Sequence, residues 1–217
     1  DIFPIGQQEG SGHVIKELKL SNNEKQDTEF VLTKSNLYTT KIINDIKPQD
    51  IKNENRIDLS NKNSYMFKSW NAENCPILPV IHIDQNKDKT INLWLHTNAI
   101  AERLDFSSKK SLEELLNKFE SFPSLSNWRN YLGEKIINAS RFNLGEKNEA
   151  ISLCIHLSSD YKIINWSFNL TFVKCSLILE NKHIEALLNR KSKTRITSRI
   201  LKPIKEYIDD LDKILEI

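Results

Sequence analysis

The sequence predicts an α+β fold in which helices accompany a mixed sheet. Two stretches alternate apolar and polar residues on both sides of a polar turn, which is the pattern of β-hairpins. A capped segment and the C-terminal segment instead repeat apolar residues with the period of an amphipathic helix. No internal repeat interrupts this arrangement along the 217 residues.

The N-terminal part predicts small elements and a boundary. "SGHVIKELKL" (11–20) is typical of a turn followed by a strand, and apolar positions near Phe30 and Leu37 favour a helix. Residues 41–63 are polar and contain Pro48, so we expect a short helix and then an extended linker. This predicts three parts: 1–40, the linker 41–63, and a larger domain over 64–217.

The larger domain begins with the two predicted hairpins. "PVIHI" (79–83) and "INLWLHT" (91–97) flank the turn "DQNKDKT", with β-branched and aromatic residues in both arms. The second alternating stretch covers 150–173 around the turn "SSDYK". We expect the two strands of the first hairpin, 79–83 and 91–97, to lie in the core.

Helices fill the remaining segments. Ser111 and Glu114 form a capping-box pattern at the start of an amphipathic segment, and "LENKHIEALLN" (179–189) predicts a short helix. A last helix is predicted over 198–217, with Pro203 near its start. Its apolar stripe consists of Leu201, Ile204, Ile208, Leu211 and Leu215.

Composition restricts the possible functions. The net charge of +2 comes from 31 basic and 29 acidic residues, so any nucleic-acid binding must depend on a local patch. Cys75, Cys154 and Cys175 form no CxxC pair, which indicates a reducing compartment, and we expect the cytoplasm. No apolar run reaches the length of a membrane span. The chain lacks an initiating methionine and stops on an apolar helix position, so we expect a fragment.

The residues themselves offer no standard catalytic or metal-binding motif. GxGxxG, P-loop, HExxH and GxSxG patterns are absent, and the five histidines lack ligand spacing. We interpret His82 and His96 as buried or half-buried strand histidines. We interpret the acidic set near the C-terminus (Glu206, Asp209, Asp210, Asp212) as an exposed helix face.

One basic segment could contact phosphates. "RKSKTR" (190–195) has four cationic residues, and Arg199, Lys202 and Lys205 follow at helical spacing. A solvated surface at the start of a helix explains the same pattern about as well. No aromatic residue lies within the run, so it gives no support for base stacking.

Six segments, taken in order, resemble a known family. They are "GHVIKEL", "EFVLTKSNL", "RIDLS", "LWLHTNAIAERLD", "GEKNEAISLCIHLSSDYKIINWSF" and "LENKHIEALL". Together they resemble the ribonuclease II/ribonuclease R (RNB) exoribonucleases, especially the divergent cyanobacterial-type members. The resemblance implies that 1–40 is the end of a cold-shock (OB) domain with a connector helix. It implies that the chain from about residue 56 onward is similar to the N-terminal half of the RNB catalytic domain.

The family's metal-binding aspartates are missing from the matching positions. The family pattern runs R-x-D-L, F-T-I-D, five residues, D-I-D-D-A-L-S-x-E and L-W-V-H-I-A-D-P. Its aspartates hold Mg²⁺ and a water for 3′ to 5′ hydrolysis of RNA. Counted back from Trp94 without a gap, 76–79 ("PILP") match D-I-D-D, and Trp70 matches the isolated upstream aspartate. His82 then matches the serine, and Asp84 the closing glutamate. Glu73 is the single carboxylate from 67 to 83.

Other family positions also differ. Ala99 replaces the aspartate of H-I-A-D-P, whereas His96 and Arg103 are retained. Pro123 in "SFPSL" and Leu179 in "LILE" stand where the family has tyrosines, the first of which stacks on RNA. The family's arginine-rich segment lies beyond the last residue of this chain.

We therefore predict a catalytically degenerate RNB-type module, with no catalytic residue, no metal ligand and no cofactor. Single-stranded RNA is the expected partner, together with a protein partner or missing chain that completes the domain, and no membrane. The candidate RNA-binding residues are Arg103, Arg190, Lys191, Lys193, Arg195 and Arg199. Two alternatives stay open. One is an active exoribonuclease with relocated ligands or ligands from missing chain. The other is a structural or protein-interaction module without an RNA role.

Overall fold

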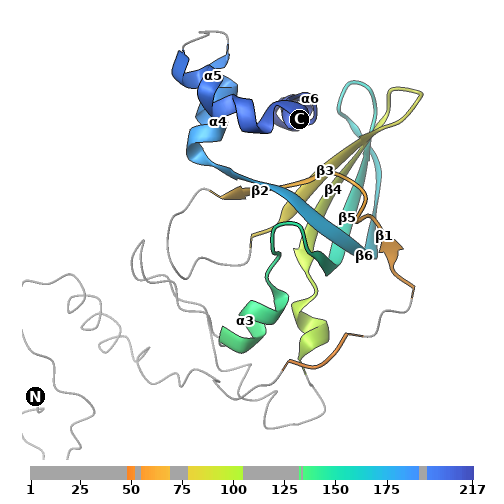
Figure 1. Ribbon diagram of the computed structural model, residues 1–217. Helices are drawn as coiled ribbons and strands as arrows, with labels where there is room; N and C mark the ends of the chain where they lie inside the picture. The colour runs from red at the N-terminus through yellow and green to blue at the C-terminus, as the bar shows by residue number, and fades with distance from the viewer. Residues whose placement is uncertain (1–47, 52–54, 69–77, 105–131, 133, 191–194) are drawn as a thin grey trace, which may run out of the picture. The chain divides into compact units, whose positions relative to one another are not determined.

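The computed structural model describes residues 48–51, 55–68, 78–104, 132, 134–190 and 195–217 (Figure 1). These residues belong to the second of two compact units, Ile42–Ile217. The strand expected at 11–20, the helix near 30–37 and the capped helix from Ser111 lie outside the described residues, so they stay predictions.

The described residues form one mixed sheet. Its strands are β1 (Ile57–Asp58), β2 (Ser64–Lys68), β3 (Val80–Gln85), β4 (Ile91–Asn98), β5 (Lys147–Leu157) and β6 (Ile163–Glu180). The strand order is β1-β6-β2-β3-β4-β5, and β5 also pairs with β6. Strand β6 pairs with β5 through its first part and with β2 through its last part, so the sheet closes on itself. Since β1 and β2 run parallel to β6 and the other pairs are antiparallel, the predicted mixed sheet is confirmed.

Both predicted hairpins are confirmed. In the β3–β4 turn, the carboxylate of Asp88 accepts hydrogen bonds from the backbone N–H and hydroxyl of Thr90, at 3.0 and 2.7 Å. Lys89 adopts a left-handed backbone with φ of 67°. In the β5–β6 turn, the Ser158 hydroxyl accepts a hydrogen bond from the Lys162 backbone N–H at 3.1 Å, and Tyr161 is left-handed with φ of 62°. The short polar side chains that predicted these turns therefore stabilise them.

The two faces of the sheet have different surroundings. The inner face carries the core cluster of Met66, Val80, Phe142, Ala150, Val173 and Cys175. The outer face carries Tyr65 and Leu179, which pack under the C-terminal helices. An irregularity in the β2–β6 register, where Ser64 pairs with Cys175 but Tyr65 pairs with Leu177, moves odd-numbered β6 residues from the inner to the outer face. The long strand β6 therefore contributes side chains to both core clusters.

The helical segments are η2 (Ile100–Arg103), α3 (Glu134–Ser140), α4 (Asn181–Leu188), α5 (Arg195–Leu201), η4 (Lys202–Tyr207) and α6 (Ile208–Glu216). The short helix predicted over 179–189 is confirmed as α4. The single helix predicted over 198–217 is instead divided into α5, η4 and α6. Pro203 accounts for the division, because it lacks an N–H and its ring clashes with the carbonyl four residues earlier. None of the described helices is long and apolar enough to cross a membrane.

The predicted stripe nevertheless faces the core. Leu201, Ile204 and Leu211 are buried with Tyr65, and Ile208 packs against the same cluster, whereas Leu215 is 39% exposed. The tighter turn of η4 preserves the direction of the stripe across the proline. Burying apolar side chains of this size contributes roughly 1.5–3 kcal/mol each, so this cluster fixes the helices on the outer face.

Candidate functional site

The residues just before β3, where the resemblance places the family's aspartates, are apolar in this chain. Of the residues that replace D-I-D-D, the structure describes Leu78 and Pro79, whereas Pro76, Ile77 and Trp70 lie outside the described residues. Leu78 packs against the inner core cluster, and Pro79 is exposed. Neither side chain has an atom that could bind a metal ion.

Among the described residues, Asp84 is the carboxylate nearest to this position along the sequence, and it is already paired. Lys62 Nζ donates to Asp84 Oδ1 at 2.7 Å. The second oxygen, Oδ2, lies 3.4 Å from His82 Nε2. That distance and its poor alignment make the contact electrostatic, because His82 Nε2 has no well-formed hydrogen bond. Ala99, at the aspartate position of H-I-A-D-P, is 2% exposed and apolar.

A chain of buried polar side chains crosses the inner face behind Asp84. His82 Nδ1 lies 2.8 Å from His96 Nε2. His96 Nδ1 lies 2.6 Å from Ser152 Oγ, which lies 2.5 Å from Thr171 Oγ1. These four residues are 1% exposed or less, and they come from β3, β4, β5 and β6 in turn. The sheet therefore buries a continuous hydrogen-bonded relay.

The carboxylate determines the direction of this relay. The charge of Asp84 favours the tautomer of His82 that carries its proton on Nε2, so Nδ1 is an acceptor. His96 must then donate from Nε2 and accept at Nδ1 from the Ser152 hydroxyl. Thr171 can in turn donate to Ser152 Oγ. The acceptor nitrogen of each neutral ring is then occupied by a hydrogen bond, so neither ring has a free lone pair for a metal.

Burial keeps both imidazoles neutral. Desolvation, together with the neighbouring His82 ring, lowers the pKa of His96 to about 3. Desolvation also lowers the pKa of His82, opposed by the charge of Asp84. Trp94 stacks on His82, with ring centroids 5.6 Å apart and planes inclined by 14°. The prediction that these are buried strand histidines is therefore confirmed, while their pairing was not predicted.

A buried charged side chain is found at Arg56 of "RIDLS". Its side chain is fully buried and ion-paired with Glu102. Its Nη1 donates to the carbonyls of Ala150 and Thr171 at 3.2 and 3.4 Å. Arg56 therefore ties the segment before β1 to β5, β6 and η2, which is a structural role.

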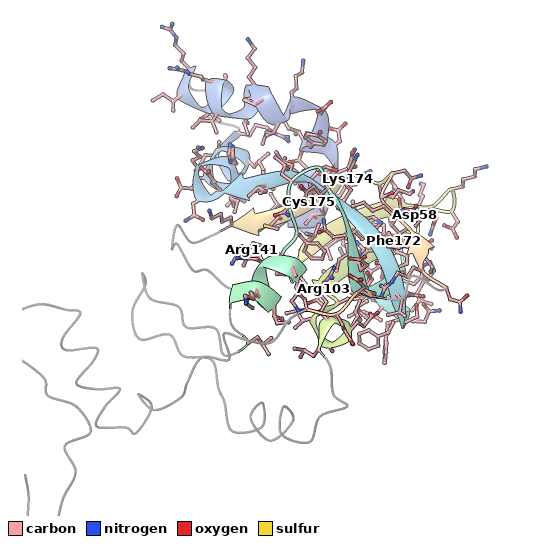
Figure 2. All side chains as sticks on the ribbon, turned by 60° about the horizontal axis from the view of Figure 1, so that its bottom comes forward. Asp58, Arg103, Arg141, Phe172, Lys174 and Cys175 are labelled. Atoms are coloured by element: carbon pink, nitrogen blue, oxygen red, sulfur yellow. The ribbon has the colours of Figure 1, made fainter. Side chains whose placement is uncertain are left out.

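The candidate RNA-binding residues fall into separate places. Arg103, labelled in Figure 2, lies in η2 and pairs with Glu149 of β5 at 2.9 Å. Arg190 follows α4 and pairs with Asp212 of α6 at 2.5 Å. Arg195 and Arg199 are exposed on α5, at the other end of the unit from Arg103, and Lys191 and Lys193 lie outside the described residues.

The acidic residues of the last helix differ in their surroundings. Glu206 and Asp209 are exposed, as predicted. Asp210 instead accepts a hydrogen bond from the Tyr65 hydroxyl at 2.8 Å, and Asp212 pairs with Arg190. Half of this set therefore stabilises contacts between elements. Among the described residues, no group of three His, Cys, Asp or Glu side chains is arranged to hold a metal ion.

The family is shown by a match over most of the chain. The family model described as RNB domain matches residues 56–217. The chain belongs to the RNB family. The predicted resemblance and the α+β fold are thus confirmed, while the cyanobacterial-type detail stays a prediction. No curated protein sequence matches the chain.

Solved structures of RNB-family proteins share its fold. Yeast Ssd1, described as a pseudonuclease, is 12% identical with a TM-score of 0.63, and the match covers 82% of this chain and 24% of that chain. Apo RNase R of Mycoplasma genitalium is 11% identical with a TM-score of 0.63, covering 85% and 30%. The same RNase R with double-stranded RNA is 10% identical with a TM-score of 0.62, covering 86% and 36%. This RNB chain therefore spans about a quarter to a third of the proteins that it resembles.

The described donor atoms do not fit the Mg²⁺ that the family resemblance implies. Mg²⁺ requires several oxygen ligands in near-octahedral geometry. Leu78, Pro79 and Ala99 offer no side-chain oxygen, and one oxygen of Asp84 is bonded to Lys62. We derive no catalytic step through a metal from these residues.

Proposed function

We propose that this RNB chain is a non-hydrolysing module that binds single-stranded RNA. The absence of hydrolysis is supported mainly by the hydrogen bond between Asp84 and Lys62. Asp84 is the one described carboxylate among the positions that match the family's aspartate motif, and this bond occupies one of its oxygens. The apolar Leu78 and the buried Ala99 support it further. Phosphoryl displacement needs neutralised charge and an activated water, and these residues supply neither.

Support for RNA as the partner comes from the family and from α5. RNase R of Mycoplasma genitalium has been solved with ribose-methylated single-stranded RNA, at 12% identity to this chain. In this chain Arg195 and Arg199 lie one helical turn apart and are exposed, and Lys202 follows at the next position of the same face. Such a row of cations can contact successive phosphates. We also propose the cytoplasm as its location, from the cysteine pattern.

Replacing Arg195 and Arg199 together by alanine is expected to weaken binding of a fluorescent single-stranded RNA. Because each phosphate contact releases counterions, the slope of log affinity against log salt should become shallower by about 1.4, or 0.7 per contact. Fluorescence anisotropy over a salt series measures this. The matched control, Lys87→Ala with Lys89→Ala in the β3–β4 turn, should leave the slope unchanged. Equal losses in both variants would contradict a site on α5.

A nuclease assay separates this proposal from the active-enzyme alternative. A 5′-labelled RNA incubated with the protein and Mg²⁺ is expected to keep its length on a denaturing gel. Progressive loss of 3′ nucleotides that EDTA abolishes would establish an active exoribonuclease and overturn the non-hydrolysing module. RNA binding without shortening supports both parts of the proposal.

A further inference from the structure

The first part of β6 forms an edge of the sheet. From 163 to 170 it pairs with β5 on one side, and none of the described strands pairs with its other side. On that other side β1 begins to pair at Thr171, and β2 pairs only from Cys175 onward. We call the stretch 163–170 the β6 edge (Figure 1). An edge strand presents backbone N–H and C=O groups that another strand can bind.

The C-terminal helix α6 reaches the hairpin turn but leaves the β6 edge exposed. The Tyr161 hydroxyl donates to Glu216 of α6 at 3.1 Å. Beyond this contact, Ile163 and Ile164 are 66% and 55% exposed, and Phe168 is 67% exposed. The helix therefore covers the turn rather than the edge strand.

The β6 edge lacks most of the features that keep edge strands apart. Such strands are usually short, bulged, or interrupted by lysine or proline. The sequence from 163 to 173, "IINWSFNLTFV", contains no charged residue, no proline and no glycine. One irregularity in the β5–β6 register leaves Ile164 as an extra residue near the start of the strand. From 165 to 170 the edge is regular and open to pairing.

The sequence of the β6 edge is nearly symmetric about Ser167. Asn165 and Asn169 are equidistant from it, as are Trp166 and Phe168, and Ile164 and Leu170. When a strand pairs antiparallel with its own copy about a two-fold axis, each residue faces its symmetric position, so such a sequence is self-complementary. Pairing with a different strand, from this chain or another protein, would need no such symmetry. The symmetry therefore favours a second copy of this chain as the occupant of the edge.

We propose that two copies of this chain form a dimer by antiparallel pairing of their β6 edges, with the two-fold axis at Ser167. Trp166 of each copy then lies directly opposite Phe168 of the other. Within one copy these two rings already meet edge to face, with centroids 5.7 Å apart, so the dimer gathers four rings on the outer face. Aromatic pairs directly opposite each other stabilise antiparallel strands. This inference is independent of RNA binding on α5.

The polar side chains of the edge suit the same pairing. Asn165, Ser167 and Asn169 alternate with the aromatic residues and so share the opposite face of the strand. The Asn169 amide donates to Ser167 Oγ at 3.0 Å, which holds it beside the proposed axis. In the dimer Asn165 of one copy faces Asn169 of the other, and two amides can exchange hydrogen bonds. Both faces of the edge are thus matched with themselves.

The length of the free edge limits the pairing at both ends. Ile57 of β1 lies beside Thr171, so the strand of the second copy must leave the sheet at that point. The residue that reaches this point is Ile163 of the second copy, next to its extra residue Ile164. A bulge bends its strand, so the bend occurs where β1 blocks further pairing. By symmetry the same holds at the other end, and 164–170 is the paired length.

Sedimentation velocity over a concentration series tests the dimer. The unmodified chain is expected to show a monomer–dimer equilibrium. Trp166→Lys with Phe168→Lys should raise the dissociation constant at least about tenfold, because two aromatic pairs become two like-charge pairs. Trp166→Glu with Phe168→Glu should do the same, and a mixture of the two double variants should recover the dimer. These side chains are 62% and 67% exposed, so the fold should persist, which circular dichroism checks.

Leu188→Lys with Ile196→Lys is the matched control, because these apolar residues of α4 and α5 are 67% and 72% exposed and lie outside the β6 edge. It should leave the dissociation constant unchanged. A chain that stays monomeric at every concentration would overturn the proposal. Equal weakening by the control, or a mixture of the two charge variants that fails to associate, would overturn it as well.

A disulfide tests the position of the axis. Ser167→Cys is made together with Cys154→Ser, because Cys154 lies opposite Ser167 within the chain. Oxidation with copper phenanthroline should join two copies, since the new thiols face each other only if the axis passes through this position. Lys87→Cys in the same background, at the exposed β3–β4 turn, should remain monomeric on a non-reducing gel. Absence of the covalent dimer, or equal yields from the two variants, would contradict the proposed pairing.

Discussion

Replacing Arg56 by methionine is expected to lower the free energy of unfolding by about 3 kcal/mol or more. The guanidinium is fully buried, and its removal leaves Glu102 without its partner and two backbone carbonyls, of Ala150 and Thr171, without their donor. Breaking a buried ion pair from one side costs about 3–5 kcal/mol, because the remaining charge stays poorly solvated. Urea unfolding followed by circular dichroism measures the change.

Arg103→Met provides the matched control. Arg103 and Glu149 are each about one-fifth exposed, so their pair should contribute about 1 kcal/mol or less. Adding Glu102→Gln to Arg56→Met should recover part of the loss, because no unpaired charge then remains. Similar losses for Arg56→Met and Arg103→Met would show that the buried pair has no special role.

Local features of the fold could be predicted from the sequence, whereas its closure could not. Nearby side chains such as Asp88 and Ser158 stabilise the β3–β4 and β5–β6 turns, so a few neighbouring residues are enough to predict them. The pairing of β2 with β6 joins Tyr65 to Leu177, more than a hundred residues apart. No local pattern encodes such a pair, and the strand β1 lies inside the stretch predicted as a linker.

In the candidate site, too, local features could be predicted from the sequence and long-range contacts could not. The absence of carboxylates at Leu78 and Pro79 can be read directly from the sequence. The relay could have been found in part, because the β3–β4 register places His82 opposite Trp94 and brings His96 to the same face. Ser152 and Thr171 could not, since their contact depends on the β5–β6 pairing together with the curl of the sheet.

The exposure of the apolar side of β6 could not be predicted, for a different reason. The alternation of Trp166, Phe168 and Leu170 predicts that one side of β6 is apolar, but it cannot say what covers that side. The sequence therefore predicts core positions only for the strands of the first hairpin, 79–83 and 91–97. Trp166, Phe168 and Leu170 are 62%, 67% and 41% exposed.

Acidification is expected to destabilise the protein between about pH 6.5 and pH 5 through His82 and His96. Both groups have a lowered pKa in the folded chain and an ordinary value near 6.5 when unfolded, so the unfolded chain binds more protons. Their contribution is fully present above about pH 6.5 and is lost as the pH falls toward the folded pKa, about 3 for His96. The slope should approach about 1.4 kcal/mol per pH unit for each histidine.

Substitutions at the charged groups that face His82 and His96 test this acid sensitivity. Asp84 raises the pKa of His82 and Lys62 lowers it, so Asp84→Asn should steepen the loss near pH 6. Replacing both histidines by leucine should remove most of the slope in urea unfolding between pH 7.5 and 5, a window above most carboxylate titration. What is left is the contribution of His183, whose pKa is also lowered by burial. An unchanged slope in that double variant would assign the acid sensitivity elsewhere. Each single variant should keep part of the slope, because the remaining ring is still buried and desolvation still lowers its pKa.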